Sequence, residues 1–390
     1  MKTAIAIGAA LLAAAGAVQA QRVTDKEIVI GTHMDLSGPV AAGMPAIRNG
    51  MQMRLDEANE AGGVNGRRFR LIVEDNAGQP AQAVRATQKL VRKDEVFAIL
   101  NAFGSGANAA AVKGAVEEGV VYFAPWAASL AVQGASGKSP LLYTTVANYD
   151  TTTAAGLSWS LKSWGAKRVG VIYQEGPLGD LVRRGVAQAM KEYGLQPVAE
   201  ASYKAGDIDF SSQVQRMKAA NADLILAATI TRETIGIMSE VKKLGWNDVR
   251  VLTANPGRTS IVAVLGKDAV DGLYGIGTWN IYYPDSAPEA VKKWMESYRK
   301  RFPNQILDEN AMLSYSYTDL FVKAVAAAGR DLTAESFGKA VAAIPYDDFM
   351  SYARGTFRGN HMMPEGARVE LLKGGRWSSV SPLLTDVTKP

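Results

Sequence analysis

The turn Gly104-Ser105-Gly106 is the part of the sequence best suited to hold an anion. It follows an apolar strand predicted over 97–100 and opens a helix predicted over 107–118. Two glycines around a serine bring backbone N–H groups to the surface, and the helix dipole adds partial positive charge at the same point. This arrangement predicts a pocket for a carboxylate or a phosphate, and a tight turn without a ligand is the plain alternative.

The same glycines also match the spacing Gly-x-Gly-x-x-Ala of a dinucleotide fingerprint, which ends here at Ala109. That site requires an acid after the next strand. The next strand, predicted over 120–123, leads into Pro125-Trp126-Ala127 and carries no carboxylate. We therefore favour the carboxylate pocket over the dinucleotide site.

Three further loops also follow predicted strands and are expected to contribute to the same ligand site. Ligands of parallel α/β sheets bind beyond the carboxyl ends of the strands. Trp126 in the first of these loops could stack on a ligand or cover the core. Gln174 follows the strand predicted over 169–173, and Asn255 follows the strand predicted over 249–253.

The inventory for catalysis and metal binding is thin. The two histidines, His33 and His361, lie far apart in the sequence, and no HExxH motif, GxSxG motif or cluster of metal-ligand residues is present. The chain has no cysteine, which excludes thiol catalysis and disulfides. Asp75 and Asp150 have the positions of capping residues. We expect no enzyme activity, no metal and no cofactor.

The first twenty residues have the pattern of a cleaved export signal. Lys2 supplies the positive start, residues 4–18 the apolar run, and Val18-Gln19-Ala20 the small-residue cleavage site. Cleavage after Ala20 would leave Gln21, not a lipid-anchored cysteine, at the start of the mature chain. The expected location is the periplasm, reached by the general secretory route. The net charge of +5 has no basic block, so nucleic acid is not an expected partner.

Apolar residues alternate between strand and helix spacing along most of the chain, which predicts an α/β fold with parallel sheets. In the first half, strands are expected over 28–30 (stopped by Gly31), 69–73, 97–100, 120–123 and 141–146, with helices over 45–61, from Pro80 and over 107–118. A second half repeats the plan, with strands over 169–173, 198–203, 224–228 and 249–253 and helices over 152–164, 178–193, 210–220 and 233–244. Helices over 288–301 and 311–328 follow, and a hairpin is expected at Gly374-Gly375.

Several segments, in order, resemble the branched-chain amino acid (Leu/Ile/Val-binding) group of periplasmic substrate-binding proteins, the receptors of ABC importers. They are LSGPVAAGMPAIRNG, ANEAGGVNGRRFRLIVEDNAGQPAQAV, AKRVGVIYQEGPLGD and DFSSQVQRMKAANADLILAA. The resemblance implies a type I periplasmic binding fold, with two Rossmann-like lobes joined by three crossover strands. The implied lobes are 21–147 with 278–355 and 148–277 with 356–390, and 278–288 is a crossover segment.

The resemblance also implies a ligand-binding set, and this chain departs from the family at four positions. Trp126 and Ala128 stand where the family has alanine and threonine, so the matching hydroxyl is missing unless Ser129 supplies it. Leu178 stands where an aromatic lid residue is common, and Asn255 replaces the acid that pairs with the ligand ammonium. The expected ligand-binding residues are Ser105, Gly106, Trp126, Ala128, Ser129, Tyr149, Gln174, Leu178 and Asn255.

A buried ammonium without a counter-charge is costly, so Asn255 favours an organic acid, with an aromatic one compatible with Trp126, over an α-amino acid. The implied partners are a small-molecule ligand, an inner-membrane ABC permease pair and its cytoplasmic ATPases, and the chain is expected to be a monomer. Three alternatives stay open: binding of branched-chain amino acids proper, a sensor that feeds a signalling receptor, and a secreted enzyme on the same fold.

Overall fold

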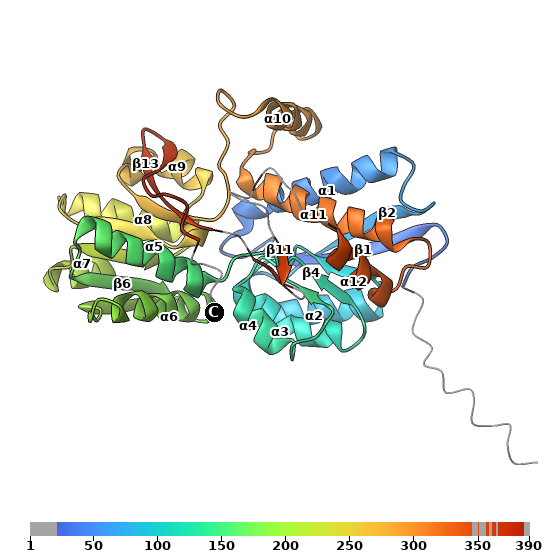
Figure 1. The fold of residues 1–390 in the computed structure, drawn as a ribbon, viewed down its shortest axis with the longest axis horizontal. Coiled ribbons are helices and arrows are strands. Elements are labelled where there is room, and N and C mark those ends of the chain that lie inside the picture. Colours follow the sequence, from blue (N-terminus) through green and yellow to red (C-terminus); the bar gives the residue numbers. More distant parts are fainter. Residues whose placement is uncertain (1–21, 345–349, 351–355, 359–360, 364–365, 386–390) are drawn as a thin grey trace, which may run out of the picture.

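The computed structural model describes residues 22–344, Met350, 356–358, 361–363 and 366–385. The export signal predicted over residues 1–20 lies outside this range. The strands fall into two large sheets and one small one. Figure 1 shows the two large sheets side by side, each with helices on both faces. We call the part built on the five-stranded sheet the first lobe and the part built on the seven-stranded sheet the second lobe.

The sheet of the first lobe is parallel throughout, in the order β2-β1-β3-β4-β5. Its strands are β1 (Glu27–Met34), β2 (Arg68–Asp75), β3 (Ala98–Leu100), β4 (Val121–Phe123) and β5 (Leu142–Tyr143). The helices that connect them are α1 (Met44–Glu60), α2 (Pro80–Arg92), α3 (Ser105–Val116) and α4 (Ser129–Ala135), with the short 3-10 turn η1 (Ala41–Gly43) before α1. Pro80 is the first residue of α2, as its missing N–H predicts.

Two helices from late in the chain complete the first lobe. They are α11 (Glu309–Ala328), which packs on α1, and α12 (Ala334–Ala343), which packs on α11. Phe321 and Phe337 from these helices contact Phe97 and Phe123 from the sheet at ring distances of 5.6–6.4 Å. The core of the first lobe therefore joins the first third of the chain to its last fifth.

The second lobe has a mixed sheet in the order β14-β13-β10-β9-β8-β6-β7. The strands are β6 (Val169–Gln174), β7 (Ala199–Tyr203), β8 (Leu224–Ala228), β9 (Arg250–Thr253), β10 (Tyr274–Gly277), β13 (Arg368–Lys373) and β14 (Arg376–Ser379). β13 is antiparallel to β10 and to β14, which confirms the hairpin predicted at Gly374-Gly375. The helical segments are α5 (Tyr149–Trp164), α6 (Pro177–Lys191), α7 (Ser211–Ala219), α8 (Thr231–Lys243), η2 (Asn255–Gly257), α9 (Ser260–Gly266) and η3 (Lys267–Val270).

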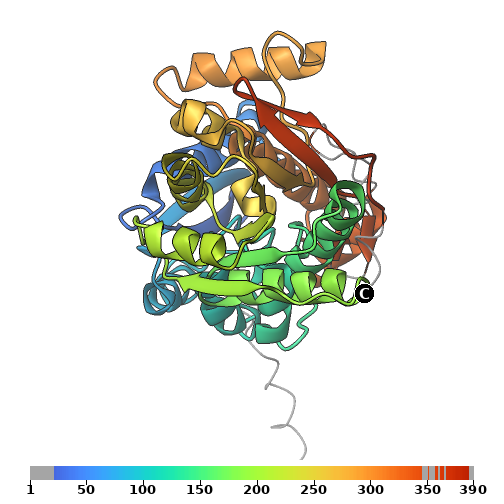
Figure 2. The same ribbon diagram turned by 90° about the vertical axis from the view of Figure 1, so that its left-hand side faces the viewer.

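The chain passes between the two lobes three times. The first passage follows β5, the second runs from Thr278 to α10 (Glu289–Arg301), and the third precedes β13 and includes residues outside the described part. The second and third passages touch, because the Asn280 amide donates to the Met350 carbonyl at 2.6 Å. A separate hairpin, β11 (Thr356–Arg358) and β12 (His361–Met363), belongs to the third passage. In Figures 1 and 2, α10 lies at the top of the molecule, apart from both sheets.

The predicted fold class is confirmed, with two wrong strand ends and several missed elements. Gly31 does not stop the first strand, which continues to Met34. A Cβ at Gly31 would lie 2.9 Å from Leu90 Cδ2 and would collide with it. The glycine therefore allows α2 to pack closely on this strand. The strand predicted over 141–146 is limited to Leu142–Tyr143, because the chain then leaves the sheet. β10 and α12 were not predicted. The residue boundaries of the lobes stay a prediction.

Candidate functional site

The turn Gly104-Ser105-Gly106 links β3 to α3, as the sequence predicts. Gly104 has a φ of +104°, a conformation that glycine adopts without strain. The first backbone bond of the helix runs from the Asn108 amide to the Gly104 carbonyl at 2.8 Å. The amides of Ser105, Gly106 and Ala107 therefore precede the helical hydrogen-bond ladder, as expected of an anion-binding helix start.

Ser105 ties this turn to the loop that follows β4. Its Oγ accepts a hydrogen bond from the Ala128 amide at 2.9 Å, so its own hydroxyl proton can be donated to a ligand. The Gly104 amide also donates to the Trp126 carbonyl at 3.0 Å. The structure thus brings together the two loops of the first lobe that the sequence assigns to the site.

Trp126 is fixed on the first lobe by its ring and its backbone. The indole Nε1 donates to Asn101 Oδ1 at 3.2 Å, and the ring meets Tyr317 of α11 edge-on at 6.2 Å between centroids. The side chain is half-buried against the core of the first lobe. The contacts of Trp126 in the structure are those of a residue that covers the core. The exposed part of the ring is the part that could stack on a ligand.

Ala128, Tyr149 and Leu178 belong to one buried apolar cluster. Ala128 comes from the first lobe and the other two come from the second, so the cluster crosses between the lobes. Ser129 begins α4 directly after Ala128. Burial raises the pKa of the Tyr149 phenol, so this ring stays neutral at physiological pH.

Gln174 ends β6 and is half-buried. The loop after it is tight, because a side chain at Gly179 would overlap the Gln174 carbonyl oxygen. The neighbouring Glu175 accepts a hydrogen bond from Ser202 Oγ at 3.0 Å on the surface. The charged residue of this loop thus bonds to the adjacent strand, while Leu178 packs in the cluster described above.

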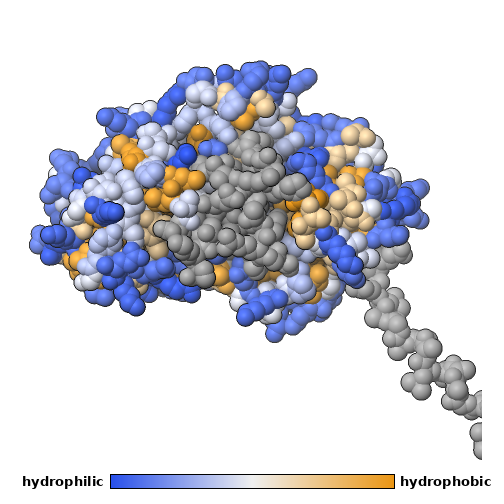
Figure 3. All heavy atoms as spheres, viewed as in Figure 1, coloured by the Kyte–Doolittle hydropathy of each residue, from blue (hydrophilic) through white to orange (hydrophobic). Residues whose placement is uncertain are grey.

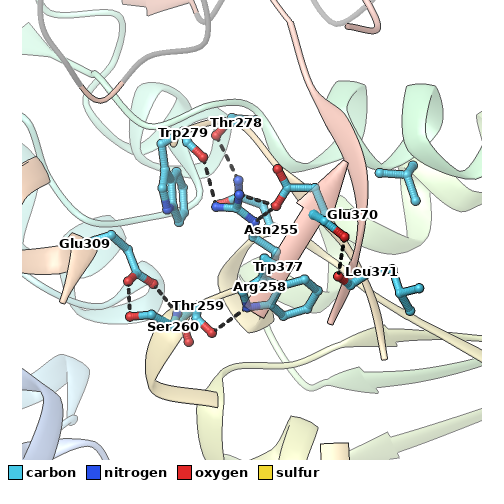
Figure 4. A network of polar contacts seen from close by, with 12 residues as sticks. Asn255, Arg258, Thr259, Ser260, Thr278, Trp279, Glu309, Glu370, Leu371 and Trp377 are labelled. Carbon is cyan, nitrogen blue, oxygen red and sulfur yellow. Dashed lines mark hydrogen bonds and ion pairs between the residues drawn. The ribbon is translucent and has the colours of Figure 1, made fainter. Parts of the chain in front are cut away.

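Asn255 is buried (2% exposed) and donates from Nδ2 to Thr278 Oγ1 at 2.8 Å, in the second passage between the lobes. It is surrounded by a network that the sequence did not predict (Figure 4). Arg258, 1% exposed, pairs with Glu370 of β13 and donates from Nη1 to the Trp279 carbonyl at 2.9 Å. Glu370 therefore balances the charge of Arg258.

The same network reaches α11 of the first lobe. Glu309 accepts hydrogen bonds from the Ser260 amide, at 2.7 Å, and from the Ser260 hydroxyl. Trp377 of β14 donates from Nε1 to the Thr259 carbonyl at 2.9 Å. The loop between β9 and α9 is therefore fixed by residues from the late helices and from the terminal hairpin (Figure 4).

The lobes also touch at two places outside these passages. A Cβ placed on Gly206, in the loop after β7, would lie 3.6 Å from Pro39 Cγ, in the loop after β1. Helices α3 and α6, whose first residues belong to the predicted site, contact each other as well. The structure therefore has its lobes drawn together around the loops assigned to the site.

Several residues around the site were missed at the sequence level. They are Asn101, Asn108, Tyr122, Arg258, Glu309 and Glu370, all of them buried. Asn101 and Tyr122 could have been identified from the sequence, because each is a polar residue inside an apolar strand or directly after one. The pairing of Arg258 with Glu370 joins residues far apart in the sequence, and no local pattern marks it.

Two α/β lobes joined by three chain passages, with the carboxyl ends of the strands carrying the candidate loops, define the class of two-lobed binding proteins. The family model described as "Periplasmic binding protein" matches residues 27–375, and the chain belongs to this family. The resemblance to the Leu/Ile/Val-binding group is thereby confirmed.

Individual relatives are distant. "Leu/Ile/Val-binding protein homolog 7" of Brucella suis is 23% identical over 81% of this chain and 80% of its own length. A fatty acid ABC transporter substrate-binding protein from Thermomonospora curvata has a TM-score of 0.81 at 23% identity, covering 95% of each chain. The branched-chain amino acid binding protein LivJ from Streptococcus pneumoniae, in complex with isoleucine, has a TM-score of 0.75 at 22% identity, covering 91% of this chain and 98% of its own. At these identities the structures establish the fold.

The part of the chain that the structure describes contains no helix long and apolar enough to cross a membrane. Within the same residues, no group of three or more histidine, aspartate or glutamate side chains could hold a metal ion. Figure 3 shows hydrophilic side chains over most of the visible face of both lobes, with apolar side chains in small patches between them.

Proposed function

We propose that this protein is the extracytoplasmic solute receptor of an ABC importer and binds a small carboxylate-bearing solute between its lobes. The observation that supports it most is the start of α3, where Ser105 bridges two loops and the first helical amides are not yet part of the ladder. Such a site holds an anion through N–H groups and the helix dipole. Binding, without chemical turnover, is the activity that this arrangement provides.

The ligand class follows from the electrostatics of the second lobe. Asn255 is neutral and bonded to Thr278, and Arg258 next to it is paired with Glu370. An ammonium beside Asn255 would lack a dedicated counter-charge, because Glu370 is paired with Arg258 and Glu309 is bonded to Ser260, and this is costly in a buried site. A plain organic acid, bound by Ser105 and the adjacent amides and flanked by the cluster of Ala128, Tyr149 and Leu178, is therefore favoured over an α-amino acid. The related protein described as a fatty acid receptor is consistent with this choice.

The test is calorimetric titration with matched pairs: 4-methylpentanoate beside leucine, and 3-phenylpropanoate beside phenylalanine. We expect each organic acid to bind more tightly than its amino acid by roughly ten- to a hundredfold, since one charge-assisted hydrogen bond contributes about 1.5–3 kcal/mol. Ser105→Ala should weaken binding of the acids by a similar factor. Tight binding of leucine with weak binding of 4-methylpentanoate would instead support a branched-chain amino acid receptor.

We further infer that residues 1–20 direct export to the periplasm, where the receptor delivers its solute as a monomer to a permease pair driven by cytoplasmic ATPases. The sequence pattern of Lys2, the apolar run and Val18-Gln19-Ala20 supports export, and family membership supports the partners. Intact-mass measurement of the exported protein should give a chain that starts at Gln21. Retention of Met1 on the bulk of the exported protein would contradict this.

A further inference from the structure

A continuous line of buried polar side chains runs beneath the candidate ligand-binding turn. His33 of β1, Asn76 after β2, Tyr122 of β4 and Asn108 of α3 are all completely buried (0% exposed). Asn76 Nδ2 lies 2.9 Å from His33 Nδ1, His33 Nε2 lies 2.9 Å from the Tyr122 hydroxyl, and that hydroxyl lies 2.6 Å from Asn108 Oδ1. We call these four residues the polar relay.

The direction of every hydrogen bond in the polar relay is determined. Asn76 Oδ1 accepts from the Gly78 amide at 2.9 Å and its Nδ2 also donates to the Phe103 carbonyl at 3.0 Å, which fixes the orientation of the amide group. His33 Nδ1 must therefore accept, so the proton of the neutral ring is on Nε2 and is donated to Tyr122. The Tyr122 hydroxyl then has its own proton to donate to Asn108.

The relay ends on the backbone of the turn itself. Because Asn108 Oδ1 is occupied by Tyr122, its Nδ2 faces the turn and donates to the carbonyls of Ala102 and Gly104, both at 2.9 Å. These two carbonyls precede Ser105, and Gly104 has the positive φ that starts α3. A rotation of the Asn108 amide would place its oxygen against two carbonyl oxygens, which is unfavourable.

We propose that the polar relay is a positioning device for ligand binding: His33, in its neutral Nε2-protonated form, fixes Tyr122 and through it the amide of Asn108 that shapes the turn at Ser105. None of the four side chains touches the ligand in this scheme, so they are positioning residues. The inference rests on the proposed function, because it assigns the ligand to the turn that the relay supports.

The charges around His33 are compatible with a neutral ring. The titratable group bonded to it is the Tyr122 phenol, whose pKa burial raises. Glu74 on β2 lies in register with His33 and is paired with Lys89 of α2. Two further carboxylates, Asp35 and Asp75, lie at the ends of these strands and accept hydrogen bonds from backbone amides of the adjoining loops. From α3, the relay receives only the uncharged Asn108. Burial lowers the pKa of His33 to about 4, so the relay stays neutral at ordinary pH.

The first experiment compares two hydroxyl deletions by amide-resolved hydrogen exchange of the ligand-free protein. Tyr122→Phe breaks the relay and keeps the ring. Tyr315→Phe is the matched control, since its hydroxyl also donates over 2.6 Å, to Glu57 on α1, away from the turn. We expect the amides of Gly104, Asn108 and Ala128 to exchange roughly three- to tenfold faster in Tyr122→Phe and to be unchanged in the control. Equal effects of both variants, or no effect at these amides, would overturn the proposal.

The second experiment needs no substitution in the relay. The chain has two histidines, so selective ¹⁵N labelling gives two imidazole spectra, and His361→Gln identifies the signal of His33. We expect the Nε2-protonated tautomer of His33 from neutral pH down to about pH 4. An Nδ1-protonated or charged ring at pH 7 would overturn the relay. Failure of 4-methylpentanoate to bind the unaltered protein would contradict the proposed ligand class and leave both relay readouts standing.

Discussion

The acidic pair Asp308–Glu309 at the start of α11 gives the protein a pH response of its own. Asp308 caps the helix through its side chain, which accepts from the amides of Asn310 and Ala311. Burial and the charge of Glu309 raise the pKa of Asp308 to about 7. Burial also raises the pKa of Glu309, which holds Ser260 across the network around Asn255. One of these carboxyl groups therefore carries a proton in the folded protein under conditions in which the unfolded chain has lost it.

Asp308 should contribute less to the stability of the protein as the pH rises. Between about pH 4 and pH 7 the folded state binds a proton at Asp308 that the unfolded state has released, so the contribution of Asp308 to the free energy of unfolding decreases across this window, while the lowered pKa of His33 acts in the opposite direction. Asp308→Asn keeps an acceptor for the helix cap and removes the titration. Urea unfolding at a series of pH values should show the free energy of unfolding of the unaltered protein falling relative to that of the variant as the pH rises. Parallel curves for the two proteins would mean that Asp308 is already ionised in the folded state.

At the residue scale, the sequence predicted the roles that local context determines. Gly104 and Ser105 form the expected turn because glycine spacing, strand and helix all lie within a few residues. The surroundings of Asn255 and Trp126 could not be predicted, since Thr278 and Tyr317 reach them from other parts of the chain. His33 carried no local signal of its role, because its partners Asn76 and Tyr122 come from different strands.

At the scale of elements, the contact between α1 and α11 strongly restricts side-chain size. A Cβ on Gly50 of α1 would overlap the carbonyl oxygen of Ala311 in α11. The two helices can therefore approach this closely only because Gly50 has no side chain. This contact fixes α11, and with it Glu309 and Tyr317, relative to the first lobe.

We predict that Gly50→Ala destabilises the protein by about 1–3 kcal/mol, the usual range for overpacking of a rigid contact. The matched control is Gly114→Ala, in the exposed part of α3, where an added Cβ meets no atom within 4 Å. That change should be neutral or should stabilise by up to about 1 kcal/mol, because alanine favours the helix. Denaturant unfolding of both variants measures the difference, and equal stabilities would show that the helices can move apart at little cost.

The helices were predicted better than the strands, for a physical reason. Long amphipathic helices such as α1 and α6 repeat their apolar positions over several turns, so the pattern is unambiguous. β10 has the sequence Tyr-Gly-Ile-Gly, whose two glycines read as a turn. It is a strand because β9 and β13 pair with it on both sides, and β13 comes from the far end of the chain.

At the scale of the whole molecule, the contact between Pro39 and Gly206 offers a direct test of lobe movement. A Cβ on Gly206 would lie 4.0 Å from Pro39 Cβ, within the range of a disulfide. Because the chain has no cysteine, Pro39→Cys with Gly206→Cys introduces a single pair of thiols. The positive φ of Gly206 makes the cysteine there strained, but it does not prevent the bond.

We expect the oxidised double variant to be held in the arrangement seen here, while the reduced form opens when no ligand is bound. Small-angle scattering of the ligand-free protein should therefore give a smaller radius of gyration after oxidation than before. The rate at which 4-methylpentanoate binds should also fall on oxidation, since the lobes can no longer separate. Each single-cysteine variant is the control. An identical radius in both redox states would indicate that the lobes do not move apart.

The arrangement of late helices and terminal strands also governs how the chain can fold as it is made. The aromatic core of the first lobe lacks Phe321 and Phe337 until most of the protein has been synthesised. The seven-stranded sheet likewise lacks β13 and β14 until residue 379 has been made. Neither half can therefore reach its final packing while the polypeptide is still emerging. A nascent chain that lacks these late segments is packed less firmly than the finished protein, and a loosely packed chain is easier to thread through a narrow channel.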